Sequence, residues 1–259
     1  MGQHFLADPH LASRIVEIGE VQTGETVVEI GPGKGALTFP LLQKGAKVIA
    51  IEKDRRLGER LRHQIKDKNF KLIVDNALFA LPRLLLPAHY KVIANLPYHI
   101  TSPVLKLLLA GDPEGNPPPP DLAVLMVQKE VAVRLTAAPG RRERGPLTLM
   151  AEYFAQQIEI VEEVPRVKFF PPPQVDSAIV KISGISRTRY PAKTQTIFFR
   201  LVRAGFAGKR QKLVNSLSRG LRLDKAEVTA FLEKIGLPLA VRAEDLSLEE
   251  WLKLTRCFQ

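Results

Sequence analysis

A tetrapeptide that follows an apolar run, Asn95-Leu96-Pro97-Tyr98, combines two hydrogen-bond acceptors with an aromatic ring. The Asn95 side-chain oxygen and the Pro97 backbone carbonyl can each accept a hydrogen from one amino group. Together they would hold its nitrogen in a more tetrahedral state, with the lone pair aimed at an electrophile. The Tyr98 ring can stack on a planar base that carries this amino group. The alternative interpretation of Asn95 is a turn residue after a strand.

A glycine-rich segment, Glu29-Ile30-Gly31-Pro32-Gly33-Lys34-Gly35, leads from an apolar run into a helix-like stretch. Glycines there allow a tight turn and close backbone approach to a ligand, with helix N–H groups directed at it. Such a turn also suits dinucleotide dehydrogenases, whose spacing is Gly-x-Gly-x-x-Gly. Here the spacing is Gly-x-Gly-x-Gly with an acidic residue directly before the turn, which resembles the class that binds S-adenosylmethionine. The expected contacts of that cofactor are Glu29, Gly31, Gly33 and Gly35.

Two further segments at the ends of apolar runs could hold an adenosine. Glu52 lies about 20 residues downstream of the glycine-rich turn, where a carboxylate can accept both ribose hydroxyls. We include the adjacent Lys53 in this contact, although both charges could simply be solvated. Asp75-Asn76-Ala77 follows the next apolar run, where we expect recognition of the cofactor adenine. Either Asp75 or Asn76 could accept from the adenine amino group, and the sequence does not choose between them.

These segments need a scaffold that brings them together, and the first two-thirds of the chain predicts one. Short runs that are nearly continuous in apolar residues alternate with helix-like stretches, which is typical of a doubly wound parallel sheet. Ligands of such sheets bind at the carboxyl ends of the strands, where the candidate residues stand. We expect strands at 26–30, 47–51, 70–74, 91–94, 122–127 and 177–182, and helices at 36–44 and 55–66.

A domain boundary is expected near Gly184, after the second of two proline clusters, 117–120 and 171–173. Prolines exclude both clusters from helices and central strands. The predicted fold is α/β: residues 1–183 form a Rossmann-like catalytic domain that binds S-adenosylmethionine, and 184–259 form a small all-helical domain. Its helices are expected at 197–205, 209–221, 225–235 and 248–256, with Asp224 capping the third and Ser247 and Glu250 forming a capping box before the last.

The charge of the chain is uneven. The formal net charge is +11, and residues 184–259 hold fifteen Lys or Arg against seven Asp or Glu, a net +8. Residues 187–219 contain nine basic residues and no acidic one. Such a surplus favours polyanionic partners such as nucleic acid or an anionic membrane, a solvated basic face being the alternative. The aromatic residues of this stretch are expected to face the core, so we expect its charges to contact the phosphates of a nucleic acid: Arg203, Lys209, Arg210 and Lys212.

Several protein classes are not indicated by the sequence. The only cysteine is Cys257, and no Cys/His cluster has metal-ligand spacing, so we expect neither a disulfide nor a metal. The first eight residues lack the apolar core of a signal peptide, and no apolar run is long enough to span a bilayer. A cytoplasmic protein is expected, and nothing suggests an obligate oligomer, so we expect a monomer.

A family resemblance emerges from several of these segments. Asn95 to Tyr98 resembles the (Asp/Asn/Ser)-x-Pro-(Tyr/Phe) motif of amino-group N-methyltransferases. With His99-Ile100-Thr101-Ser102 behind it, the run resembles the ribosomal RNA adenine dimethylase family, and most closely its small-subunit rRNA branch. Residues 2–6, Gly-Gln-His-Phe-Leu, are similar to the family's Gly-Gln-Asn-Phe-Leu. Residues 169–177 and 206–217 match further family stretches, so the resemblance covers nearly the whole chain.

The resemblance implies an activity and a set of roles. It implies transfer of methyl groups from S-adenosylmethionine to the N6 amino groups of two adjacent adenines near the 3′ end of small-subunit rRNA, within a pre-assembled subunit during ribosome biogenesis. Gln3, His4 and Leu6 would line the methionine end of the cofactor. Phe169 would close the target pocket opposite Tyr98, plain core being its alternative. His4 replaces the usual Asn and Asn76 the usual Asp, and neither His4 nor His99 receives a catalytic role.

Three other functions remain in competition. A large-subunit rRNA adenine methylase of the macrolide-resistance type is related, but the Asn-Leu-Pro-Tyr-His-Ile-Thr run and the proline-rich Phe169 segment favour the small-subunit branch. An RNA-binding assembly or transcription factor on a methylase scaffold would not need Glu29, Glu52 or Asn95, although a second role in assembly stays open. A nicotinamide dehydrogenase would leave the Asn95 to Tyr98 segment without a purpose.

Overall fold

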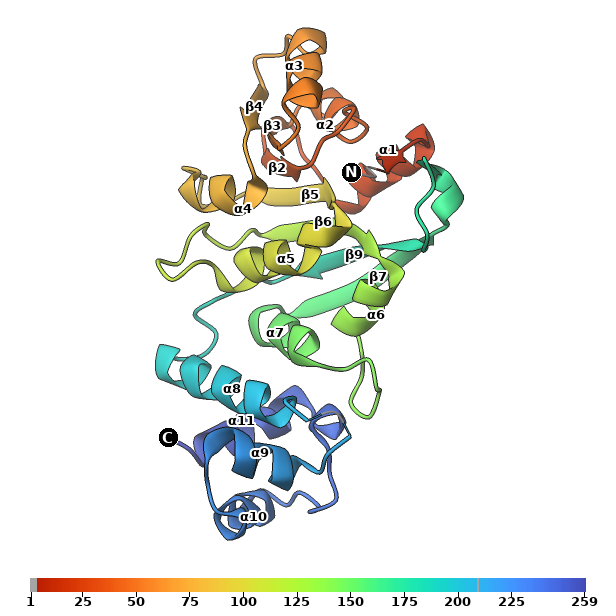
Figure 1. The fold of residues 1–259 in the computed structure, drawn as a ribbon. Coiled ribbons are helices and arrows are strands. Elements are labelled where there is room, and N and C mark those ends of the chain that lie inside the picture. The colour runs from red at the N-terminus through yellow and green to blue at the C-terminus, as the bar shows by residue number, and fades with distance from the viewer. Residues whose placement is uncertain (1–3, 209) are drawn as a thin grey trace. The chain divides into compact units, whose positions relative to one another are not determined.

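The computed structural model describes residues 4–208 and 210–259, and the chain divides into two compact units. The sheet unit consists of the chain up to Ala132 together with Ala155–Ser186. The helical unit consists of Val133–Phe154 and Arg187–Gln259. The expected break near Gly184 lies close to the Ser186/Arg187 boundary. The prediction that residues 1–183 form one domain does not hold for 133–154, which fold with the C-terminal part of the chain (Figure 1).

The sheet unit contains a mixed sheet whose central strands are parallel. Among the described residues, seven strands form this sheet in the order β4-β3-β2-β5-β6-β9-β7. The first five strands in this order, from β4 through β3, β2 and β5 to β6, run parallel to one another. β9 is antiparallel to both of its neighbours, β6 and β7. This confirms the Rossmann-like α/β prediction. The strands are β2 Thr26–Ile30, β3 Lys47–Glu52, β4 Phe70–Val74, β5 Lys91–Asn95, β6 Leu122–Gln128, β7 Gln157–Val164 and β9 Ser177–Ser183.

Apolar residues on both faces explain why these runs become central strands. Val27 and Val28 are successive residues of β2, and both are completely buried. On one face, α1 and α2 cover a core that includes Val27, Val48 and Ile93. Asp8 starts α1 by accepting from the backbone N–H groups of His10 and Leu11. The helices of this part of the chain are α1 Pro9–Ile18, α2 Thr38–Gln43, α3 Arg55–Gln64, α4 Ala77–Ala80, α5 Thr101–Ala110 and α6 Lys129–Leu135, with 3₁₀ turns at Leu81–Arg83, Tyr98–Ile100 and Arg166–Lys168.

A two-stranded sheet joins the start of the chain to the second proline cluster. β1 (Phe5–Leu6) pairs antiparallel with β8 (Phe169–Phe170). In this register Leu6 lies opposite Phe169 and Phe5 lies opposite Phe170. The pairing brings residues more than 160 positions apart in the sequence into direct contact.

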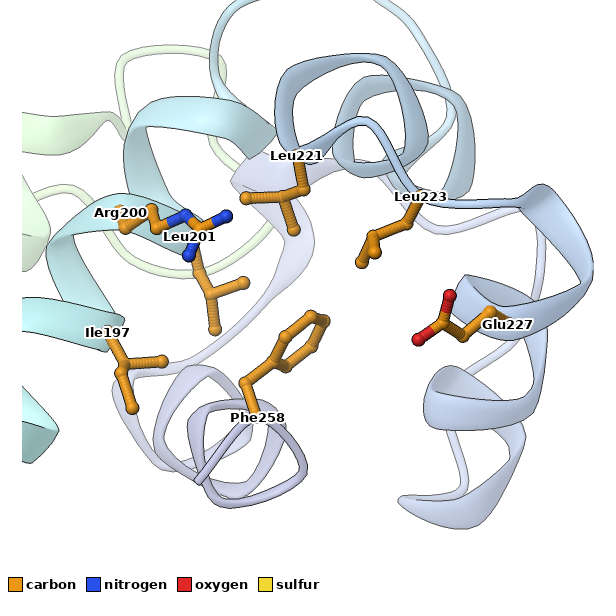
Figure 2. A pocket seen from close by; sticks show the side chains of 7 residues that line it. All are labelled: Ile197, Arg200, Leu201, Leu221, Leu223, Glu227 and Phe258. Carbon is orange, nitrogen blue, oxygen red and sulfur yellow. The ribbon is translucent and has the colours of Figure 1, made fainter.

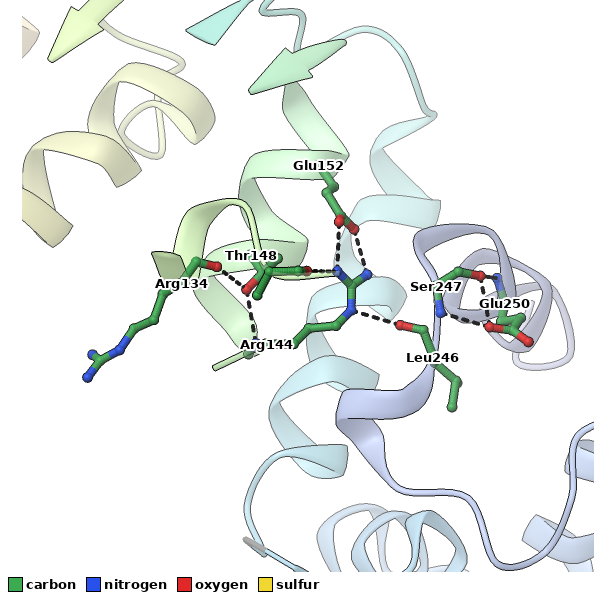
Figure 3. Close-up of polar contacts among 9 residues, drawn as sticks. Arg134, Arg144, Thr148, Glu152, Leu246, Ser247 and Glu250 are labelled. Carbon is green, nitrogen blue, oxygen red and sulfur yellow. Dashed lines mark hydrogen bonds and ion pairs between the residues drawn. The ribbon is translucent and has the colours of Figure 1, made fainter. Parts of the chain in front are cut away.

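A buried arginine helps to join the segment 133–154 to the rest of the helical unit. The Arg144 guanidinium is fully buried, and it forms two 2.7 Å hydrogen bonds to the Glu152 carboxylate (Figure 3). It also donates to the carbonyls of Ala137 and Leu246, at 2.7 and 2.9 Å. The bond to Leu246 ties 133–154 to a residue 102 positions later, while the others lie within the segment. The helices of this unit are α7 Pro146–Phe154, α8 Ala192–Gly205, α9 Leu213–Leu221, α10 Lys225–Lys234 and α11 Leu248–Arg256, with a 3₁₀ turn at Ala243–Asp245.

The expected helices of the C-terminal region are present, and their caps agree with the sequence. Asp224 accepts from the Ala226 N–H at the start of α10. Ser247 and Glu250 form the predicted capping box of α11. Phe198 is fully buried against Tyr153, which confirms that this aromatic residue faces the core.

Candidate active site

The glycine-rich turn and the Asn95 to Tyr98 segment lie against each other at the carboxyl ends of the central strands. β2 pairs with both β3 and β5, so the residues that follow these three strands share one edge of the sheet. Gly31 adopts φ +71°, which favours glycine, and a Cβ there would lie 3.3 Å from Pro97 Cδ. The Gly31 N–H donates to the Ile51 carbonyl at 2.9 Å. The two segments that the sequence singles out therefore form one site.

Glu52 closes the turn from the neighbouring strand. Its Oε2 accepts from the Gly33 N–H at 3.0 Å, and its Oε1 accepts from the Asp54 N–H at 2.8 Å. Gly33 has φ +59°, and a Cβ there would meet the Phe5 ring at 3.1 Å. The Phe5 ring can therefore pack against the loop only because residue 33 has no side chain. Gly35 completes the turn by donating to the Pro32 carbonyl at 2.8 Å.

Glu29 is a buried acid beside this turn. It is 2% exposed, and its Oε2 accepts from the Thr38 hydroxyl at 2.6 Å. Burial raises the pKa of Glu29 to about 8, the Thr38 hydrogen bond opposes the rise and the nearby Glu52 charge adds to it. Glu29 is thus largely protonated at neutral pH in the ligand-free protein. Thr38 belongs to no motif, and sequence reasoning missed it.

The segment after β4 presents two possible acceptors beside Glu52. The Asp75 N–H donates to the Glu52 carbonyl at 3.0 Å, which fixes the segment next to β3. Asp75 is exposed, and its Oδ1 accepts from the Asn76 N–H. Asn76 caps α4, because its Oδ1 accepts from the Leu78 N–H at 3.1 Å. Ala77 is buried, and Lys53 is exposed.

Asn95 ends β5, and the chain then turns into the 3₁₀ helix Tyr98–Ile100. Asn95 is partly buried. The Pro97 carbonyl already accepts from the Ile100 N–H at 3.0 Å and from the Thr101 hydroxyl at 3.4 Å. Among the hydrogen bonds of the described residues, none falls on the Leu96 carbonyl. The Leu96 carbonyl is therefore a second candidate, beside the predicted Pro97 carbonyl, for accepting a hydrogen of an amino group.

Tyr98 is held at both its hydroxyl and its ring. The hydroxyl lies 2.8 Å from Ser177 Oγ, and the ring stands 6.2 Å from the His4 ring, centroid to centroid, at an interplanar angle of 28°. Burial raises the pKa of the Tyr98 hydroxyl, the Ser177 hydrogen bond lowers it, and the Asp176 charge raises it. Tyr98 stays protonated at neutral pH and presents a neutral ring.

The second aromatic residue predicted for the target pocket, Phe169, is buried. Phe169 is 3% exposed and packs in the core with Leu6, which favours the alternative of a core residue. Its neighbour Phe170 is 69% exposed, because successive residues of a strand point to opposite faces. Gln3, which was predicted to line the cofactor, lies outside the described residues.

The candidate RNA-binding residues that the structure describes in the helical unit are exposed. Arg203 lies in the last turn of α8, where its Nε donates to the Phe199 carbonyl at 3.3 Å. Arg210 has φ +67°, and Lys212 directly precedes α9. Lys209 lies outside the described residues. Arg203 and Lys212 stand at the ends of helices, where side chains can reach a phosphate backbone.

A separate pocket of about 200 Å³ lies within the helical unit. Figure 2 shows Phe258 directed into it, with Arg200 and Glu227 on opposite sides. Its walls are otherwise aliphatic, and it contains none of the residues predicted for the active site.

Metal-ligating clusters and membrane-spanning helices are both missing from the described ranges. Across residues 4–208 and 210–259, no group of three His, Cys, Asp or Glu residues could hold a metal ion. No helix in the same ranges is long and apolar enough to cross a membrane.

Comparisons with known proteins agree with this geometry. The family model for ribosomal RNA adenine dimethylase matches residues 1–259. Ribosomal RNA small subunit methyltransferase A of Dehalococcoides mccartyi (strain CBDB1) is 40% identical over 257 residues, which cover 98% of this chain and 86% of the relative. The protein of the same name from Synechocystis is 38% identical, covering 98% and 93%.

Two solved structures are similar over nearly their whole length. A dimethyladenosine transferase from Plasmodium falciparum has a TM-score of 0.80 and 27% identity, covering 98% of this chain and 97% of its own. The 23S rRNA methyltransferase ErmE has a TM-score of 0.75 and 29% identity, covering 97% and 98%.

Proposed function

This chain belongs to the ribosomal RNA adenine dimethylase family, and we propose that it dimethylates the N6 amino groups of two adjacent adenines near the 3′ end of small-subunit rRNA, with S-adenosylmethionine as methyl donor. The observation that carries this proposal is the contact between the glycine-rich turn and the Asn95 to Tyr98 segment. A Cβ on Gly31 would lie 3.3 Å from Pro97, so the loop for the methyl donor adjoins the segment for the amino acceptor.

The choice of small-subunit rRNA rests on sequence rather than on fold. The structures that resemble this chain include enzymes named for two different activities, with TM-scores of 0.80 and 0.75. The curated relatives at 38–40% identity are named for the small subunit. The Asn-Leu-Pro-Tyr-His-Ile-Thr run supports the same branch.

The residues at the strand ends suit S-adenosylmethionine. Gly31, Gly33 and Gly35 all have positive φ and no side chain, so the chain can turn tightly at the strand end and a ligand can approach its backbone. The Glu52 oxygens keep lone pairs beyond their two N–H partners, and these can accept the ribose hydroxyls. Glu29, Lys53, Ala77, Leu6, Gln3 and His4 complete the proposed cofactor contacts, with Asp75 or Asn76 at the adenine.

The bound cofactor supplies an electrophilic methyl group on a sulfonium, and the protein prepares the nucleophile. The Asn95 side-chain oxygen accepts one hydrogen of the adenine amino group. The second goes to a backbone carbonyl, either that of Leu96 or that of Pro97, where it would replace the 3.4 Å hydrogen bond from the Thr101 hydroxyl. These two acceptors would aim the nitrogen lone pair at the methyl group that S-adenosylmethionine would supply, and the proton of the alkylated nitrogen would be lost to water. Tyr98 stacks on the adenine and sets its plane.

Substrate delivery is assigned to the helical unit. Its basic residues, Arg203, Lys209, Arg210 and Lys212, would contact phosphates of the rRNA. We further propose a cytoplasmic monomer that acts on a pre-assembled small subunit during ribosome biogenesis. A second role as an assembly factor is compatible with this activity, because methylation and assistance in assembly would both begin with binding to an immature subunit.

The test is transfer of labelled methyl from S-adenosylmethionine to unmethylated small subunits, to naked small-subunit rRNA and to large-subunit rRNA. Dimethyladenine at two adjacent 3′-end positions of the small subunit is expected. Asn95→Ala should abolish transfer, whereas Asn95→Asp retains an acceptor oxygen and should retain part of the rate. Label in large-subunit rRNA would reassign the substrate. Tight rRNA binding without any label would leave a binding factor on a methylase fold.

A further inference from the structure

His4 contacts two parts of the target site that are far apart in the sequence. Its ring lies 6.2 Å from the Tyr98 ring at 28° between planes, within the usual separation of interacting aromatic rings. Its Nδ1 lies 2.7 Å from the Pro171 carbonyl oxygen. One side chain thus bridges the segment proposed to bind the target base and the proline cluster 171–173.

The bridge has a defined orientation. A carbonyl oxygen can only accept, so His4 Nδ1 carries the hydrogen and donates it to Pro171. Residues 4 and 171 directly adjoin the Phe5–Phe170 pair of β1 and β8, so the strand register brings them to the same place. The imidazole is therefore anchored by its own hydrogen bond and by the backbone on which it stands.

Tyr98, by contrast, needs support to keep its ring plane. It lies in a single 3₁₀ turn, and its hydroxyl is fixed to Ser177 Oγ at 2.8 Å. A hydroxyl anchor fixes the tip of the side chain but leaves rotation about the long axis of the ring. A neighbouring ring in a stacked arrangement restricts that rotation, and among the described residues His4 supplies such a ring, 6.2 Å away between centroids.

We propose that His4 is a positioning residue for the target adenine, acting through Tyr98. It holds the Tyr98 ring at one orientation and ties that ring to the proline cluster, beside which Phe170 is exposed. The adenine that stacks on Tyr98 then meets the methyl donor with its amino nitrogen in line. This proposal rests on the methyl-transfer function, and it gives His4 a role beyond contact with the cofactor.

The ring and the hydrogen bond of His4 can be separated by substitution. His4→Phe keeps a ring beside Tyr98 and loses the donor to Pro171. His4→Asn keeps a donor close to the position of Nδ1 and loses the ring. His4→Ala loses both. His10, an exposed histidine on the neighbouring helix, supplies the control His10→Ala.

The experiment measures kcat and KM on unmethylated small subunits and, separately, the Kd of S-adenosylmethionine by calorimetry. His4→Ala should lower kcat by about tenfold, the effect of a modest loss of orientation, while changing the cofactor Kd far less. His4→Phe should restore most of kcat, His4→Asn less, and His10→Ala should match the wild type. In a Tyr98→Ala background, His4→Ala should have little further effect, because residues that act as a unit are non-additive.

Two results would overturn the proposal. One is an equal loss of cofactor affinity and of kcat/KM in His4→Ala, which would make His4 a cofactor contact only. The other is full additivity with Tyr98→Ala. Failure of the underlying function is distinguishable, because the wild-type protein would then transfer no methyl at all, whereas a wrong role for His4 leaves wild-type transfer intact.

Discussion

Glu29 is the residue at which burial and charge conflict most directly. A carboxyl with 2% exposure and one hydroxyl donor cannot be solvated as an anion, so the protein keeps it protonated near neutral pH. A protonated carboxyl can donate as well as accept, which widens what it can offer to a ligand. The cost of ionising it appears as a dependence of stability on pH.

The ligand-free protein should lose stability as pH rises from about 4.5 to about 8, the unfolded and folded pKa values of Glu29. In that range the native state holds a proton that the unfolded chain releases, so raising the pH favours unfolding. Glu29→Gln cannot ionise. Its free energy of unfolding should exceed that of the wild type by on the order of a few kcal/mol at pH 9, and the advantage should shrink at pH 5. Urea titrations at the two pH values test this, and a constant difference would contradict it.

Asn76→Asp should tighten binding of S-adenosylmethionine severalfold. The Asn76 oxygen is already engaged with the Leu78 N–H, whereas an aspartate would keep that cap and add a second, charged oxygen for the cofactor adenine. Asp75→Asn is the matched control, because it removes one negative charge from the adjacent residue, whereas Asn76→Asp adds one. The Kd of each variant is measured by calorimetry. If Asp75→Asn weakens binding and Asn76→Asp has no effect, Asp75 is the adenine contact.

The positions of individual residues were predictable where a sequence motif determines them, and they were not predictable where tertiary packing determines them. The turn glycines follow one strand, and Glu52 and Asn95 are the last residues of two others. The apolar runs of these strands are plain in the sequence, so the meeting of these residues at one edge of the sheet was predictable. Thr38 was not, because nothing near it marks a partner for Glu29. Phe169 and Phe170 are identical neighbours, and only the register of β8 against β1 decides which is buried.

At the scale of elements, the central strands matched the prediction within a residue, since strands covered on both faces are continuous in apolar residues. The edge strand β7 was not predicted, because its Gln-Ile-Glu-Ile-Val-Glu-Glu-Val sequence mixes acidic and apolar residues. The place of α7 was also missed. It packs with the helical unit through long-range contacts, such as the Arg144–Leu246 hydrogen bond and the Tyr153–Phe198 ring contact, which no local pattern marks.

Arg144→Met should destabilise the helical unit by about 3–5 kcal/mol, because it strips the Glu152 carboxylate of its partner and leaves two carbonyls without their donor. Hydrogen exchange of residues 137–152 should accelerate, while cofactor binding by the sheet unit stays unchanged. Arg142→Met is the control, since Arg142 is exposed and pairs with the adjacent Glu143. Equal exchange in the two variants would show that the Arg144 network does not hold this segment.

At the scale of the whole molecule, the basic stretch and the proposed catalytic residues belong to different units. The sheet unit carries the acids and amides proposed for catalysis, while residues 187–219, all of which fall in the helical unit, hold nine basic residues and no acidic one. An electrostatic contribution from the helical unit should show in the salt dependence of RNA binding, because each phosphate contact releases counterions. The turnover of bound substrate should not depend on it.

Replacing Arg203, Arg210 and Lys212 together with Gln should reduce the slope of log K against log salt by roughly 0.7–0.9 for each phosphate interaction that the substitutions remove. KM for small subunits should rise, while kcat at saturation and the Kd of S-adenosylmethionine stay near wild type. The matched control replaces three exposed arginines of α3, Arg56, Arg60 and Arg62, and so removes the same charge from the sheet unit. Equal slopes for the two triple variants would mean that only net charge matters. A smaller slope found only for the variant of the helical unit would identify this unit as the surface that binds the rRNA backbone.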